Sequence, residues 1–82
     1  MKNKIIRTPI QLGPLLKEIR FENSFTQVQL YEESYVLPKT ISALENGNIK
    51  CTLESFFDYI NACGYHMELV SNNIDKDNEE VD

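Results

Sequence analysis

The segment that decides the fold spans residues 26–47 and reads TQVQLYEESYVLPKTISALENG. It predicts two short helices joined by a tight corner, the first over about 26–34 and the second over about 38–45. Thr26 is a favoured N-cap residue, because its hydroxyl can accept a hydrogen bond from an early amide of the first helix. Gly47 can adopt the positive φ that commonly ends a helix, so it predicts the end of the second.

The second helix combines an apolar back with a front of short side chains. Ile41 and Leu44 lie three residues apart and predict one buried stripe. The residues around that stripe are Thr40, Ser42 and Ala43, which are short and mostly polar. A helix of this kind can enter the major groove of DNA without a steric clash, as a recognition helix must.

Further residues extend the pattern at fixed spacing on both sides of this segment. The matching positions are Phe25–Gln27, Leu30, Val36, Thr40–Ser42 and Leu44–Gly47, with Leu12–Gly13, Leu16 and Arg20 upstream and Thr52–Phe57 and Ala62–Gly64 downstream. On these residues the chain resembles the Cro and phage-repressor (XRE-like) helix-turn-helix family over roughly residues 5–70. The resemblance implies a mainly α, compact, lambda-repressor-like domain of four to five helices.

Apolar residues define the other expected helices. An N-terminal helix opens at Thr8-Pro9 and carries the stripe Leu12, Leu15, Leu16 and Ile19, with Pro14 either bending it or marking its regular start. Val28 and Leu30 are expected to supply apolar packing in the first helix of the 26–47 segment. A later helix, capped by Thr52 and ended by Gly64, has an apolar face of Leu53, Phe56, Phe57 and Ile60.

The segment after Gly64 has a different periodicity. Tyr65, Met67 and Leu69 alternate with His66, Glu68 and Val70, and a period of two residues predicts a strand. A single strand leaves unpaired edges, so we expect it to pair with its copy across a two-fold axis. This segment resembles the antitoxin of HipA/HipB systems, in which a short strand after the last helix pairs in a dimer.

Length and the distribution of charge predict how the chain is organised into segments. The sequence has 82 residues, 41% of them hydrophobic, and a net charge of −5, which predicts one small domain with a thin core. We expect an arm or short strand over 1–7, a helix-turn-helix domain over 8–64, a dimerisation strand over 65–70 and a disordered acidic tail over 71–82. The tail holds five acidic residues against one lysine, so the folded part is close to neutral.

Several function classes are not expected. Cys51 and Cys63 suit reduced thiols in a cytosolic protein better than a disulfide, and too few Cys and His residues are present for a zinc motif. No segment of about 18 apolar residues predicts a membrane span, and no Gly-rich phosphate loop or catalytic spacing is found. We therefore expect no enzyme, no metal and no cofactor, and we interpret His66 as a residue of the dimer seam.

The candidate DNA-binding residues lie on or near the second helix of the central segment. The resemblance implies that Gln27 contacts a phosphate. The alternative is a side chain that contacts only solvent. Lys39 could bind guanine or a phosphate, Thr40 and Ser42 could reach bases or phosphates, and the Ala43 methyl could contact a thymine methyl. The full set is Gln27, Pro38, Lys39, Thr40, Ser42, Ala43, Asn46 and Lys50, and a wider basic face could include Lys2, Lys4 and Arg7.

Three positions depart from the family pattern. Tyr31 replaces a small residue, so its side chain must point outward or push the next helix away. Tyr35 replaces a Gly, and a left-handed conformation costs a non-Gly residue about 1–2 kcal/mol, so a rebuilt corner is one possible outcome. Leu37-Pro38 replaces a polar cap and a base-reading Gln. The resemblance also implies that Arg20 and Glu45 form a structural pair between the first and third helices.

These features together predict a dimeric DNA-binding antitoxin. We expect it to repress its own operon at double-stranded operator DNA and to bind a HipA-like kinase toxin. One alternative is a stand-alone repressor with the same fold. Another is an adaptor that has lost DNA binding, which the departures at Tyr31, Tyr35 and Pro38 would explain.

Overall fold

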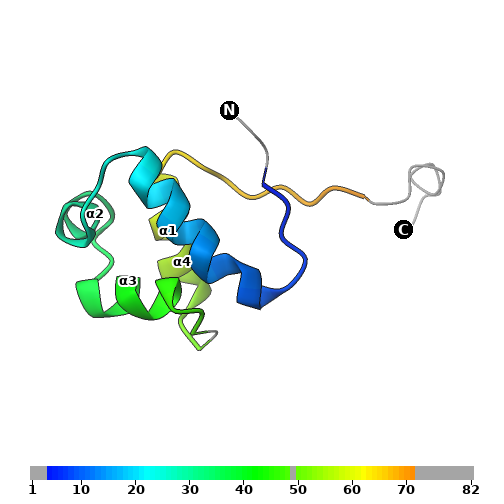
Figure 1. Cartoon of the computed structure of the whole chain (residues 1–82), viewed down its shortest axis with the longest axis horizontal. Coiled ribbons are helices and arrows are strands. Elements are labelled where there is room, and N and C mark those ends of the chain that lie inside the picture. The colour runs from blue at the N-terminus through cyan, green and yellow to red at the C-terminus, as the bar shows by residue number, and fades with distance from the viewer. Residues whose placement is uncertain (1–3, 49, 72–82) are drawn as a thin grey trace.

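Four α-helices and one 3-10 turn form the helical body of the computed structural model, which describes residues 4–48 and 50–71 (Figure 1). The elements are η1 (Pro9–Gln11), α1 (Leu12–Glu22), α2 (Gln27–Ser34), α3 (Pro38–Glu45) and α4 (Leu53–Ala62). α3 packs against α1, α2 and α4, so its inner side is supported by three helices. The predicted mainly helical fold is confirmed, and α2 and α3 lie where the sequence places them. The N-terminal helix differs from its prediction, because the chain forms the short turn η1 at Pro9 and becomes α-helical only at Leu12.

Helix starts follow from their capping residues. The Thr26 hydroxyl accepts a hydrogen bond from the Gln29 amide at 3.1 Å, and the Gln29 side chain accepts one from the Thr26 amide at 2.8 Å. Both bonds satisfy donors that a helix N-terminus otherwise leaves free. α1 begins at Leu12, so Pro14 falls in its first turn, where amides have no intrahelical acceptor. Of the two alternatives for Pro14, the structure therefore shows a proline close to the helix start.

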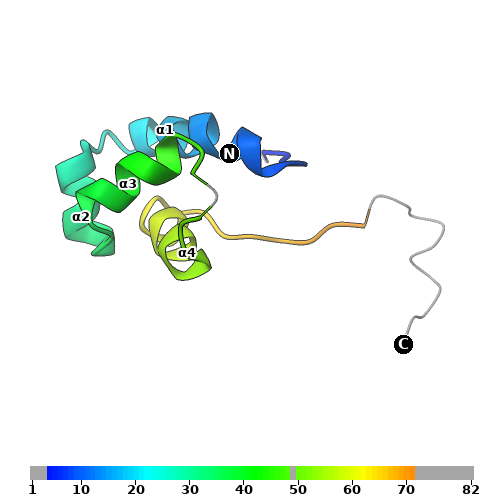
Figure 2. The ribbon, with the colours of Figure 1, turned by 90° about the horizontal axis from the view of Figure 1, so that it is seen from below.

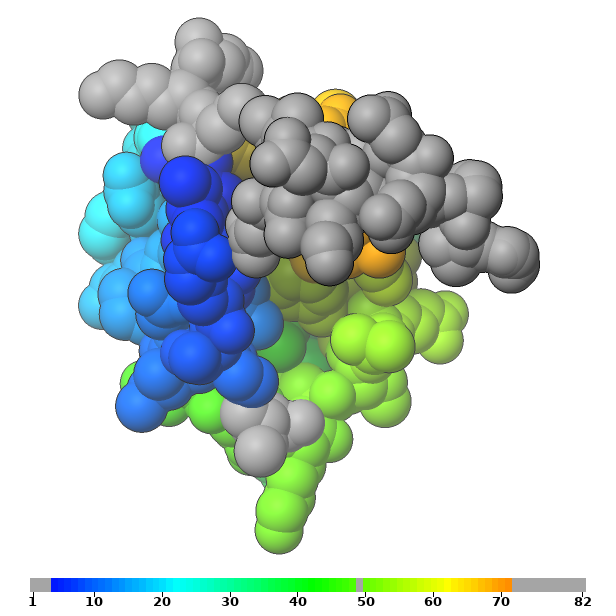
Figure 3. Space-filling view, turned by 90° about the vertical axis from the view of Figure 1, so that its right-hand side faces the viewer, coloured from blue at the N-terminus to red at the C-terminus, as the bar shows by residue number. Residues whose placement is uncertain are grey.

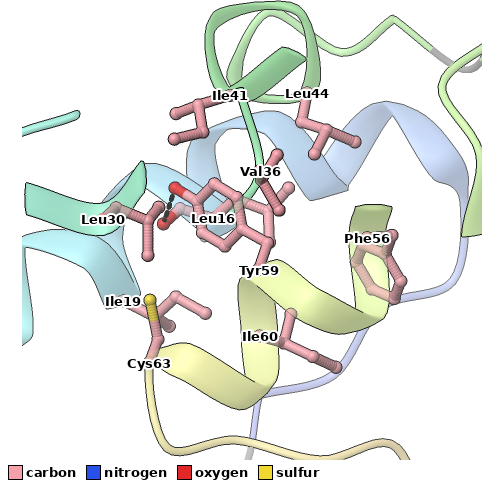
Figure 4. Close-up of a cluster of buried hydrophobic side chains, with 10 residues drawn as sticks. All are labelled: Leu16, Ile19, Leu30, Val36, Ile41, Leu44, Phe56, Tyr59, Ile60 and Cys63. Atoms are coloured by element: carbon pink, nitrogen blue, oxygen red, sulfur yellow. Dashed lines mark hydrogen bonds between the residues drawn. The ribbon is translucent and has the colours of Figure 1, made fainter. Parts of the chain in front are cut away.

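The core gathers residues from all four helices around Tyr59 (Figure 4). Its other members are Leu16, Ile19, Leu30, Val36, Ile41, Leu44, Phe56, Ile60 and Cys63. Tyr59 was not predicted as a core residue, although the spacing of positions 56, 59, 60 and 63 is that of one helix face. Burial raises the pKa of the Cys63 thiol to about 11. Both cysteines are free thiols, as expected.

Two core predictions were wrong in part. Val28 is 58% exposed, because two residues along an α-helix turn it about 200° away from the buried Leu30. Leu53 is 73% exposed, because it lies in the first turn of α4, outside the core cluster, and Phe57 is also exposed. The rest of the predicted stripes are buried or packed against the core.

Gly13 allows α1 and the end of α3 to approach closely. A Cβ atom at this position would lie 2.6 Å from the Glu45 carbonyl oxygen and 3.1 Å from the Gly47 amide nitrogen. Real Cβ atoms do not come so near to backbone atoms, so any larger residue here would push α3 away from α1. The spacing between the two helices thus depends on the absence of a side chain at this one position.

The chain after α4 is extended and leaves the helical body, as Figures 1 and 2 show. Within residues 4–48 and 50–71 no β-strand is present, so the single chain does not show the strand predicted for Tyr65–Val70. The Tyr65 hydroxyl donates a hydrogen bond to Glu22 at 2.7 Å, which fixes the start of this segment on α1. Its later apolar residues are exposed, with Leu69 at 99%.

The N-terminal segment from Lys4 to Thr8 lies beside α1 (Figure 3). The Lys4 ammonium is 3.2 Å from Glu18 and 3.4 Å from Glu22, and those carboxylates raise the pKa of Lys4. Its charge is therefore already paired with two carboxylates, which makes Lys4 a weaker candidate for the wider basic face. Lys2 and the predicted tail from residue 72 onward lie outside the described residues. None of the helices described here is long and apolar enough to cross a bilayer.

Candidate nucleic-acid interface

The outward face of α3 is set by helical spacing. Ile41 and Leu44 are buried against the core. Lys39, Ser42, Ala43 and Asn46 are separated by three, four and seven residues and therefore share the opposite face. Lys39 and Asn46 are exposed, whereas Ser42 and Ala43 are half-buried, and Ser42 bonds Gln27 of α2. These four residues, Lys39, Ser42, Ala43 and Asn46, form the α3 outward face, and the half-buried Thr40 lies at its edge.

The corner before α3 keeps its shape without a glycine. Tyr35 adopts the left-handed conformation at φ 63°, and its amide donates to the Tyr31 carbonyl at 2.7 Å. The buried Ser34 hydroxyl donates to the Leu30 carbonyl at 2.7 Å and accepts from the Val36 amide at 3.0 Å. The rebuilt corner that the sequence allowed is not formed. Sequence reasoning missed Ser34, whose hydroxyl bonds backbone groups on both sides of the corner.

The unusual side chains of the corner point into solvent. Tyr35 is 82% exposed, and Tyr31 is partly exposed on α2. α2 and α3 remain in contact, so Tyr31 takes the outward of its two expected positions. Leu37 makes no side-chain cap bond and is exposed, as is Pro38 at the first position of α3. The departures from the family pattern therefore change the surface at this end of α3 and leave its path intact.

Behind α3, the Glu45 side chain is bonded by residues of three other helices, α1, α2 and α4. Arg20 of α1 donates through Nε to Glu45 Oε2 at 2.6 Å and through Nη2 to Oε1 at 3.0 Å. Tyr59 of α4 places its hydroxyl 2.5 Å from Glu45 Oε2. The side chains of Arg20 and Glu45 are 6% and 5% exposed. This is the pair that the resemblance implies, extended by Tyr59, which sequence reasoning did not include.

The environment of Glu45 keeps it ionised. Burial by itself raises the pKa of the carboxyl, but hydrogen bonds from Arg20, Tyr59 and Gln27 outweigh it and hold that pKa below its usual 4.5. Burial and then the carboxylate itself raise the pKa of Tyr59 above its ordinary range. The phenol is therefore protonated at neutral pH and can donate to Glu45.

Gln27 connects this buried group to the α3 outward face. Its Nε2 donates to Glu45 Oε1 at 3.2 Å, and its Oε1 accepts from the Ser42 hydroxyl at 3.2 Å. The amide has a second N–H group, which remains for another acceptor. Gln27 is thus a half-buried, oriented residue, in place of the freely solvated side chain that the alternative interpretation described.

The end of α3 presents Asn46 and a loop that carries Lys50. Gly47 has φ 82°, and the Asn48 amide donates to the Ala43 carbonyl at 2.9 Å, which closes the helix. The Asn48 side chain accepts from the Lys50 amide at 2.8 Å. Asn46 and Lys50 are both exposed, so their side chains can reach a ligand that approaches the end of α3.

Comparisons with known proteins agree with this geometry. A structure described as a HipA–HipB–O2–O3 complex has a chain with 30% sequence identity and a TM-score of 0.77, and the match covers 87% of this chain and 100% of that one. The chain belongs to the HipB-type helix-turn-helix family. A complex of variant HipB with an O2 20mer matches at 29% identity and a TM-score of 0.78, over 88% of this chain and 100% of that one.

A third structure, described as "MDT Protein", matches at 30% identity and a TM-score of 0.77, covering 87% of this chain and 100% of that one. No protein-family model matches the chain, and no curated protein matches it significantly. The HipB-type family is not enzymatic. In the described part of the chain, no three His, Cys, Asp or Glu residues gather as a metal site would need.

Within this HipB-type fold, the residues predicted to form the dimer strand lie away from α3, on the extended C-terminal segment. His66 lies 3.0 Å from Glu68, and both side chains are exposed. Met67, Leu69 and Val70 are exposed apolar residues on the extended segment. The structure therefore brings the α3 residues together on one face. It places Tyr65–Val70 apart from them, on a segment that leaves the helical body (Figure 2).

Proposed function

We propose that the chain is a dimeric DNA-binding antitoxin that represses its own operon and binds a HipA-like kinase toxin. The observation that carries this proposal is the rigid presentation of α3, whose back is fixed by Ile41, Leu44 and Glu45 while its outward face is open. The similar HipB structures are described as complexes with HipA and with O2 and O3, which supports both partners.

On DNA, α3 would lie in the major groove with short side chains toward the bases. Lys39 can donate to guanine O6 and N7 or to a phosphate, and the Ala43 methyl can contact a thymine methyl. The second N–H of Gln27 suits a phosphate, because its other polar atoms are already bonded. Pro38, Thr40, Asn46 and Lys50 complete the proposed interface at the two ends of α3.

The dimer would form through the extended segment Tyr65–Val70. Its apolar side chains Met67, Leu69 and Val70 are exposed to solvent in a single chain. Its backbone has no strand partner within residues 4–48 and 50–71. Pairing with a second copy would bury these side chains and complete a two-stranded ladder. The two α3 helices would then enter successive major grooves about 34 Å apart on a palindromic operator. Residues 8–64 would form the DNA-binding domain.

A binding assay with the chain's own promoter tests the DNA-binding part. We expect micromolar protein to shift this DNA at low salt and Lys39→Ala to weaken binding with the dimer unchanged. Lys17→Ala, which removes the same charge from an exposed position on α1, is the matched control. If wild-type protein shifts no promoter fragment at low salt, direct repression is wrong and the adaptor alternative is favoured.

The salt dependence of the same assay separates the two roles of Lys39. A lost phosphate contact reduces the slope of log K against log salt by about 0.9, so two copies in a dimer reduce it by roughly 2. A lost guanine contact instead relaxes preference at one symmetric base pair. Co-purification from the native operon tests the toxin: a HipA-like kinase is expected, and its absence favours the stand-alone repressor.

A further inference from the structure

A chain of hydrogen bonds with one fixed direction runs from the core to the α3 outward face. At its inner end, Glu45 accepts from Arg20 at 2.6 and 3.0 Å and from Tyr59 at 2.5 Å. An ionised carboxylate has acceptors only. Any further group that bonds Glu45 must therefore present a donor.

That requirement fixes the orientation of the Gln27 amide. Its Nε2 lies 3.2 Å from Glu45 Oε1, and a reversed amide would place a carbonyl oxygen against a carboxylate oxygen. The Gln27 Oε1 must then face Ser42 Oγ, which lies at 3.2 Å. Because Oε1 has no hydrogen, the Ser42 hydroxyl is the donor in this bond.

Ser42 is thereby left with acceptor capacity only. A serine hydroxyl has one hydrogen and two lone pairs, and here the hydrogen points back to Gln27. Its lone pairs remain for a ligand on the α3 outward face, beside Lys39, which is a donor only. A phosphate oxygen cannot bond these lone pairs, and neither can guanine O6, guanine N7 or thymine O4.

We propose that Ser42, oriented by Gln27 and Glu45, accepts a hydrogen bond from an exocyclic amino group of the operator, either adenine N6 or cytosine N4. These are the two donors that base pairs present in the major groove. This inference rests on the proposed DNA binding and narrows it. Ser42 selects an amino group at one base position, whereas Gln27 and Glu45 are positioning residues that act through Ser42.

Base analogues that lack only the amino group test the proposal. Each adenine of one operator half-site is replaced by purine, and each cytosine by 2-pyrimidinone, one position at a time, and affinity is measured with the full chain. We expect one position to lose roughly 5- to 100-fold in wild-type affinity, beyond the loss at neighbouring positions. Purine sensitivity identifies adenine as the donor, and 2-pyrimidinone sensitivity identifies cytosine.

Variants separate the Ser42 contact from general effects on the duplex. Ser42→Ala should bind the natural operator more weakly and show no excess loss at that position. Ser55→Ala, the same change on α4, should behave as wild type. Gln27→Met, which removes both bonds of the amide, should free the hydroxyl to donate and so reduce discrimination between amino and keto bases at the same position.

Three results would overturn the inference. The excess loss could persist in Ser42→Ala, every analogue could be equally tolerated by wild type, or Ser42 sensitivity could map to a guanine or thymine. Each of these leaves DNA binding intact. By contrast, wild-type protein that binds no promoter fragment overturns the proposed function and this inference together, so the two failures are distinguishable.

Discussion

The surroundings of Glu45 and the segment Tyr65–Ser71 represent two extremes within one chain. Residues of α1, α2 and α4 bond the Glu45 side chain, which is 5% exposed. By contrast, Leu69 is 99% exposed and Val70 is 76% exposed. The difference shows that the α3 support is complete within one molecule, whereas the apolar side chains of Met67, Leu69 and Val70 are left largely exposed to solvent. Folding and assembly should therefore respond to different mutations.

The strongest change predicted for any variant is the loss of the proposed dimer. Leu69→Asp should weaken the dimer by roughly 100- to 10,000-fold, because burying a Leu contributes about 1.5–3 kcal/mol and each dimer contains two copies. Sedimentation equilibrium measures this dissociation constant. Ile10→Asp, at another exposed apolar position, is the control. An unchanged dimer would place the seam outside Tyr65–Val70.

Removing the cation that pairs with Glu45 should destabilise the folded chain. Arg20→Ala should lower the free energy of unfolding by about 3–5 kcal/mol, because it leaves the buried Glu45 carboxylate without its cation. Denaturant unfolding at one fixed protein concentration measures this change, since the proposed dimer would make stability depend on concentration. Lys17→Ala should change it by no more than about 0.5 kcal/mol. A loss of under about 1 kcal/mol for Arg20→Ala would show that the pair is not a main support of α3.

The third prediction concerns pH and the same carboxylate. The pKa of Glu45 is lowered on folding, so its contribution is complete above 4.5 and is lost as pH falls through the lower native value. One such group changes the unfolding free energy by at most about 1.4 kcal/mol per pH unit. Glu45→Gln should therefore flatten the stability curve in acid. An equally steep curve in the variant would assign the pH dependence to other carboxylates, such as Glu22.

A smaller change in stability is predicted for the corner between α2 and α3. Tyr35→Gly should raise the free energy of unfolding by about 0.5–1 kcal/mol, because the left-handed conformation at φ 63° costs a non-Gly residue about 1–2 kcal/mol. The greater freedom of Gly in the unfolded chain offsets part of this gain. Tyr35→Ala keeps the strain and should be close to neutral. Equal stability of the two variants would show that the tyrosine is not strained.

The sequence predicted most of the fold because its helices carry local signals. Thr26, Thr52 and Gly47 set helix ends through bonds within a few residues, and the stripe around Leu16 and Ile19 follows helical spacing. Boundaries that depend on neighbouring residues were therefore accessible. The length of α3 and its buried Ile41 and Leu44 also followed from the sequence.

What the sequence did not reveal depends on contacts between distant residues. The Tyr59 hydroxyl bonds Glu45, 14 positions away, and Gln27 is oriented by Glu45, 18 positions away. Ser34 stabilises the corner through its side chain, where the family pattern drew attention to Tyr35. No local pattern encodes the direction of a hydrogen bond, so the acceptor character of Ser42 appears only in three dimensions. The pairing of Tyr65–Val70 stays a prediction.

The way in which α3 is anchored has an evolutionary consequence. Of the four residues on its outward face, only Ser42 has a side-chain bond to the supporting network. None of Lys39, Ala43 and Asn46 contributes a side-chain bond to the scaffold beneath them, so they can be exchanged without breaking that network, provided the residue at the half-buried position 43 stays small. Duplicated copies of this gene could diverge toward new operators by drift at these three positions, and an engineer could recode the domain by randomising them while leaving Gly13 and Glu45 untouched.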